Sequence, residues 1–93
     1  MVSQVMVSSN RLRVLRAEKR VTQMNVAKRV LGISNFRYWQ IEHGYLYPRV
    51  REIRRLARFF GVDARVIFSH LTEGWDALEP EVEPKVEPKV ATP

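Results

Sequence analysis

Apolar residues recur at helical rather than alternating spacing along the first two-thirds of the chain. Leu12 and Leu15 lie three positions apart, Val26 and Val30 lie four apart, and the apolar positions of 53–60 follow the same rule. This spacing places such residues on one face of a helix. The pattern therefore predicts an all-α chain.

Capping residues and glycines divide this pattern into five short helices, expected at about 9–19, 22–31, 34–42, 49–60 and 63–71. The N-caps should be residues whose side-chain oxygen can accept a backbone N–H: Ser9 or Asn10, Thr22, Ser34 and Asp63. Pro48 precedes the fourth helix, and the fifth has Val66, Ile67 and Leu71 as its apolar residues. The residues expected to end helices are Gly32, Gly44 and Gly61.

Charge is distributed unevenly along the chain, whose net charge is +6. Residues 10–72 hold fourteen basic and four acidic residues, a net charge of +10, whereas 73–93 hold six acidic and two basic residues, a net charge of −4. We therefore expect an N-terminal arm (1–9), a basic helical domain (10–72) and an acidic Pro-rich tail (73–93). A basic globular domain is expected to bind a polyanion.

The tail contains a four-residue repeat over 79–90 with proline always in second place, which predicts a disordered, extended segment. Ninety-three residues leave room for one domain, and the absence of cysteine fits a reducing, cytoplasmic compartment. We see no signal peptide or membrane-spanning run. His43 and His70 lack catalytic or metal-binding neighbours, so we expect no enzyme activity, metal or cofactor.

A set of caps, glycines and core positions recurs in a recognisable order. Its members are Leu15-Arg16, Val21-Thr22-Gln23, Val26-Ala27, Gly32-Ile33-Ser34, Ile41-Glu42-His43-Gly44, Pro48, Leu56-Ala57, Gly61-Val62-Asp63 and Ile67-Phe68. Over about 10–68 this set resembles the Cro/cI-type (XRE) helix-turn-helix family of bacterial regulators. One departure is that Gln23 to Ser34 is one residue longer than usual in that family, which predicts an enlarged turn between the second and third helices.

The resemblance implies a lambda-repressor-like helix-turn-helix domain that binds double-stranded DNA sequence-specifically, as a transcriptional regulator, most simply a repressor, and as a homodimer. It implies a structural ion pair between Arg16 and Glu42. It places four side chains of the third helix at base edges: Asn35, Phe36, Trp39 and Gln40. Tyr38 should lie in the core.

The remaining expected contacts lie around that helix and after the fifth one. The side chains assigned to DNA phosphates or bases are Gln23, Arg37, Arg49 and Arg51. The apolar residues assigned to the dimer interface are Phe68, Leu71, Trp75 and Leu78. The alternative for Trp75 and Leu78 is that they fold back on their own domain.

Two other functions stay open. In the first, the same fold is a protein-interaction module, because Phe36, Trp39 and Tyr45-Leu46-Tyr47 are apolar where a DNA-contacting surface is commonly polar. In the second, the chain is an antitoxin-type autorepressor, which keeps DNA binding and adds a protein partner for the tail.

Overall fold

The computed structural model of the chain describes residue 7 and residues 9–77. These residues form α1 (Leu12–Lys19), α2 (Gln23–Asn25), which continues as the π-helix η1 (Val26–Leu31), α3 (Asn35–Glu42), α4 (Val50–Phe60), α5 (Ala64–Ile67) and a short 3-10 turn, η2 (Trp75–Ala77). Because α2 and η1 are one continuous helix, the predicted all-α fold of five helices is confirmed. The Pro-rich repeat lies outside the described residues.

The predicted N-caps of the second, third and fifth helices are confirmed. Thr22 Oγ1 accepts from the N–H of Asn25 at 3.1 Å, and Ser34 Oγ accepts from the N–H of Arg37 at 3.0 Å. Asp63 Oδ1 accepts from the N–H of Arg65 at 2.8 Å. Each bond satisfies an amide that has no partner within its own helix.

The fifth helix is shorter than predicted, because it ends at Ile67 and leaves Leu71 beyond it. Phe68 adopts an extended backbone (φ −118°, ψ 109°) and forms an isolated antiparallel bridge with Asn10. The N–H of Arg11 donates to the Ile67 carbonyl at 3.0 Å as part of this contact. Pairing with the segment before α1 therefore replaces the next helical turn.

The extra residue between Gln23 and Ser34 lies inside the second helix and not in the turn, so the predicted enlarged turn is wrong. Val26–Leu31 is a π-helix, in which each N–H bonds to the carbonyl five residues earlier and one turn takes up an additional residue. Gly32 then ends the helix with φ 68°, a left-handed conformation that glycine adopts without strain. Only Gly32 and Ile33 separate Leu31 from the Ser34 cap.

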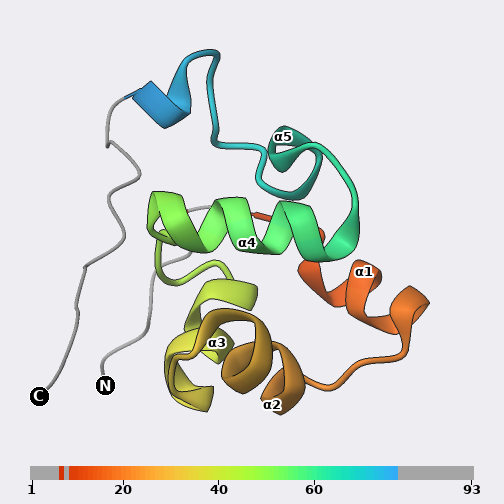
Figure 1. Cartoon of the computed structure of the whole chain (residues 1–93). Helices are drawn as coiled ribbons and strands as arrows, with labels where there is room; N and C mark the ends of the chain where they lie inside the picture. Colours follow the sequence, from red (N-terminus) through yellow and green to blue (C-terminus); the bar gives the residue numbers. More distant parts are fainter. Residues whose placement is uncertain (1–6, 8, 78–93) are drawn as a thin grey trace, which may run out of the picture.

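The helices pack around one apolar core. Figure 1 shows α4 crossing the middle of the molecule, with α2 and α3 below it, α5 above it and α1 to one side. The fully buried side chains of the core include Leu12 of α1, Tyr38 and Ile41 of α3, Leu56 of α4 and Ile67 of α5. The predicted core position of Tyr38 is therefore confirmed.

Candidate nucleic-acid interface

The two faces of α3 differ in burial. Tyr38 and Ile41 are fully buried on its inner face. Its outer face carries the four side chains predicted to read bases: Asn35 and Phe36 are exposed, Phe36 by 62%, and Trp39 and Gln40 are half-buried. Positions three and four apart share a helix face, so these four side chains form one continuous surface.

The C-terminal end of α3 is fixed by an ion pair with α1. Arg16 Nε donates to Glu42 Oε1 at 2.7 Å and Arg16 Nη2 donates to Glu42 Oε2 at 2.8 Å, so the contact is bidentate. Arg16 Nη1 also donates to the Val21 carbonyl at 3.0 Å. The Glu42 side chain is 1% exposed and that of Arg16 is 17% exposed. The structure therefore brings together the two residues that the resemblance paired.

Burial by itself would raise the pKa of Glu42, but hydrogen bonds from Arg16 and the positive charge of that residue outweigh it and hold the pKa below its usual range. Burial raises the pKa of the neighbouring Tyr38 phenol, and the Glu42 carboxylate raises it further. Gln23 Nε2 donates to Glu42 Oε2 at 3.3 Å. Gln23, expected at the DNA backbone, thus links the start of α2 to the end of α3.

The N-terminal part of α3 is held by a second ion pair, this time with α4. Arg37 Nε and Nη2 donate to Glu52 Oε2 and Oε1, each at 2.9 Å. Glu52 is 3% exposed, and its Oε1 also accepts from the N–H of Arg49 at 2.7 Å. The hydrogen bond to Glu52 raises the pKa of Arg37.

This second pair gives Arg37, expected at a phosphate or a base, a structural contact within its own domain. Glu52 is a functional residue that the sequence reasoning missed. Its signal was available: Glu52 is the one carboxylate between residues 43 and 62, and it sits in the first turn of a helix otherwise rich in arginine. Glu52 at this position caps α4 and faces Arg37 in the first turn of α3.

Aromatic rings run along the outer face of α3, from its first turn to its C-terminal end. The rings of Phe36 and Trp39 stack with centroids 5.9 Å apart and planes 12° apart. Trp39 also contacts His43 and Tyr45, at centroid distances of 4.4 Å and 5.5 Å. Exposed Phe36 thus continues a row of rings, which we call the aromatic cluster (Phe36, Trp39, His43, Tyr45).

The segment between α3 and α4 leads to Arg49 and Arg51, the two other arginines that we predicted to contact DNA. Tyr47 is 52% exposed, and its hydroxyl donates to the Val7 carbonyl at 3.1 Å. Arg49 is exposed at the N-cap of α4, and Arg51 is half-buried in its first turn. Both arginines therefore lie at the helix start that adjoins α3 through the Arg37–Glu52 pair.

The predicted dimer residues are not equally available to a second copy. Phe68 is fully buried in the core, which corrects its assignment to an interface. The physical reason is its extended backbone, which aligns it with Asn10 under α1. Leu71 and Trp75 are half-buried against the same core, and Leu78 lies outside the described residues.

The Gly32–Ile33 turn joins the second helix (α2 and η1) to α3, and together they form a helix-turn-helix motif. Within this motif α3 is fixed at both ends, and its outer face is uncovered. A family model described as a helix-turn-helix domain matches residues 9–67, more than half of the chain. The chain therefore belongs to the helix-turn-helix domain family, which is typically composed of DNA-binding regulators rather than enzymes. No curated protein and no solved structure matches the chain significantly.

The helices of the described residues are short, α4 being 11 residues long. None of the helices within 9–77 is long and apolar enough to cross a membrane.

Proposed function

We propose that this helix-turn-helix protein is a Cro/cI-type transcriptional regulator that binds double-stranded DNA sequence-specifically, represses transcription and acts as a homodimer. The observation that carries the proposal is the fixation of α3 at both ends by buried ion pairs while its outer face is left to solvent. A helix held in this way can enter a major groove without losing conformational freedom on binding.

The side chains on that outer face suit base recognition. Asn35 and Gln40 each have an amide that can donate to and accept from adenine, and Phe36 can pack against a thymine methyl group. Arg49 and Arg51 at the start of α4, with the +10 charge of residues 10–72, would contact phosphates. Arg37 acts in this scheme by positioning α3, because its guanidinium is paired with Glu52.

Selection from a randomised duplex library with the purified full chain tests the proposal. We expect Asn35→Ala and Gln40→Ala to relax the sequence preference, at about 1–3 kcal/mol per lost bidentate contact. Arg51→Ala should weaken all sequences alike while preserving the preferred site. If both amide variants select the wild-type site with wild-type discrimination, α3 does not read the bases.

The homodimer is proposed on Leu71 and Trp75, whose side chains keep part of their surface open. With Pro48, Val50, Ile53, His70 and Thr72 they line a hollow of about 290 Å³. A two-fold mate would double the site that a single motif reads. Sedimentation of the wild type beside Leu71→Lys tests this, since a wild-type chain that stays monomeric at high concentration without DNA rules out a preformed dimer.

The aromatic cluster favours a second candidate function, binding of a protein partner through α3. Phe36 is 62% exposed although its ring stacks on Trp39, and such exposed apolar surface is costly unless something covers it. Phe36→Ser separates the candidates. A relaxed preference at one base pair with retained folding supports contact with DNA, whereas unchanged duplex binding and unchanged sequence preference leave the cluster without a role at the DNA and favour the protein-partner candidate.

A further inference from the structure

A basic groove lies between η1 and α4, away from the outer face of α3. It has a volume of about 510 Å³ and is lined by Asn25, Arg29, Val30, Arg55, Arg58 and Phe59. None of these six described residues is acidic, whereas three are arginines. Lys19 adds a further positive charge, since its Nζ lies 5.0 Å from the centroid of the Phe59 ring. The groove therefore combines apolar side chains with cationic ones.

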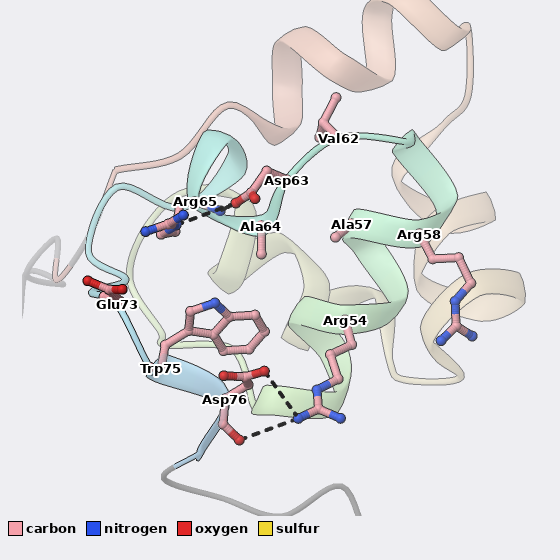
Figure 2. A pocket seen from close by; sticks show the side chains of 11 residues that line it. Arg54, Ala57, Arg58, Val62, Asp63, Ala64, Arg65, Glu73, Trp75 and Asp76 are labelled. Atoms are coloured by element: carbon pink, nitrogen blue, oxygen red, sulfur yellow. Dashed lines mark hydrogen bonds and ion pairs between the residues drawn. The ribbon is translucent and has the colours of Figure 1, made fainter.

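The last described residues contact α4 at Arg54, one helical turn before Arg58 of the groove. The Asp76 carbonyl accepts from Arg54 Nη2 at 3.4 Å, and Asp76 Oδ2 lies 4.0 Å from the same nitrogen. Figure 2 shows this contact at Arg54, with Arg58 on the next turn of α4 pointing away from Trp75. Arg58 lines the groove and also a separate hollow of about 430 Å³, which Arg54, Trp75 and Asp76 line as well.

The rise from Arg54 to Arg58 is short compared with the length of chain between Asp76 and the repeat. Arg54 and Arg58 are four residues apart on one helix face, a rise of about 6 Å. Three residues of extended chain, from Asp76 to Glu79, span up to about 10 Å. The first acidic residue of the repeat can therefore reach Arg58 without any rearrangement of the helices.

The composition of the first part of the tail matches that of the groove. Residues 79–83 read Glu-Pro-Glu-Val-Glu, with three carboxylates and no basic residue, while the lysines of the repeat follow at 85 and 89. The segment thus offers carboxylates to a groove rich in arginine, and Pro80 and Val82 are apolar residues that match Val30 and Phe59. Prolines also restrict the chain to extended conformations, which lowers the entropy lost on docking.

We propose that residues 79–83 dock in the groove lined by Arg29, Arg55 and Arg58 of their own chain. The bound tail neutralises one side of the basic domain and competes there with polyanions. The inference goes beyond the proposed function, and it does not depend on DNA binding because its readout is structural.

A spin label on the tail tests the contact in the full chain. The natural sequence has no cysteine, so Val86→Cys supplies a single labelling site. In ¹⁵N spectra at low salt we expect the label to remove most of the intensity of the Arg29, Val30 and Phe59 amide signals, relative to the reduced label. Raising the salt to about 1 M should restore the signals, since charges are screened within about 3 Å there.

Matched variants decide whether the groove is the binding site. Arg29→Glu should restore the lost intensity, whereas Lys28→Glu, the same charge change at the adjacent exposed position, should leave the broadening in place. Glu79→Gln, Glu81→Gln and Glu83→Gln combined should also restore the signals, and this variant changes no residue of the folded domain.

Three outcomes would overturn the proposal. Undiminished groove signals in the Val86→Cys chain would mean that the tail stays away from the groove. Equal responses to Arg29→Glu and Lys28→Glu would mean unspecific attraction of the tail to a basic surface. Broadening that appears when labelled chains without ¹⁵N are mixed with unlabelled ¹⁵N chains would mean that the tail docks on a second copy.

Discussion

Changing one partner of the Arg16–Glu42 pair should be among the most destabilising polar substitutions in the domain. Glu42→Gln preserves the size of the side chain but removes the charge, and it turns one acceptor of the bidentate contact into a donor that faces Arg16. Removing one partner of a buried pair leaves the other charge uncompensated and costs about 3–5 kcal/mol. Arg16 is only 17% exposed, so water can compensate little of this.

This cost is large for a domain of this size. Stabilities of about 0.05–0.15 kcal/mol per residue give about 4–10 kcal/mol for the described part of the chain, so the substitution removes a third of the stability or more. For a urea dependence of about 1 kcal/mol per M, the unfolding midpoint should fall by about 3–5 M. Far-UV circular dichroism at pH 7 measures this midpoint through the helices.

Two further variants make the measurement specific. Glu18→Gln removes an exposed carboxylate from the helix that carries Arg16, and its effect should stay within about 0.5 kcal/mol. The double variant Arg16→Met with Glu42→Met leaves no unpaired charge and should recover much of the loss. A loss below about 1 kcal/mol for Glu42→Gln, the range of exposed pairs, would refute the view that this contact is buried and fixes α3.

Three other predictions follow from local geometry. The pKa of Glu42 in the folded state lies below its ordinary value of 4.5, so its contribution to the free energy of unfolding is fully present above about pH 4.5 and is lost as the pH falls through the folded pKa. Urea titrations at different pH values should therefore show that the unfolding free energy of Glu42→Gln depends less on acid pH than that of the wild type. Arg20 ends α1 with φ 60°, so Arg20→Gly should raise the melting temperature by relieving up to about 1 kcal/mol of strain, and a decrease would contradict this reading. Phe68→Ala should lower the unfolding free energy by about 3–5 kcal/mol at any protein concentration. The control Val66→Ala, at an exposed site, should lower it by about 0.5 kcal/mol or less. A loss for Phe68→Ala that appears only at concentrations where a dimer forms would mean that Phe68 lies in an interface after all.

The parts of the fold that the sequence predicted are those determined by local chemistry. Thr22, Ser34 and Asp63 each accept a hydrogen bond from an amide two or three residues later, so neighbours in sequence decide where those helices begin. The Arg16–Glu42 pair spans 26 residues, and it came from the family resemblance and not from any property of the two residues alone.

The parts that the sequence did not predict depend on which side chains meet in three dimensions. Apolar spacing marks Phe68 as a residue to be covered, but it does not say whether its own core or a second copy covers it. Arg37 has the same chemistry whether it faces Glu52 or a phosphate, and only the packing of α3 against α4 decides between them. Side chains for binding and side chains for support are therefore hard to separate from the sequence of a basic domain.

The extra residue in the second helix shows how packing decides where an insertion goes. The ion pairs at the two ends of α3 require it to lie close to α1 and α4. The π-helical geometry of η1 takes up the extra residue, so Ala27 and Leu31 both remain buried and Gln23 still reaches Glu42. π-helical turns are rare and occur mostly as single turns inside α-helices. The contacts that fix α3 thus explain why the additional residue lies in η1 and not in the turn that follows it. The outer face of α3 keeps the position that the proposed DNA contact requires.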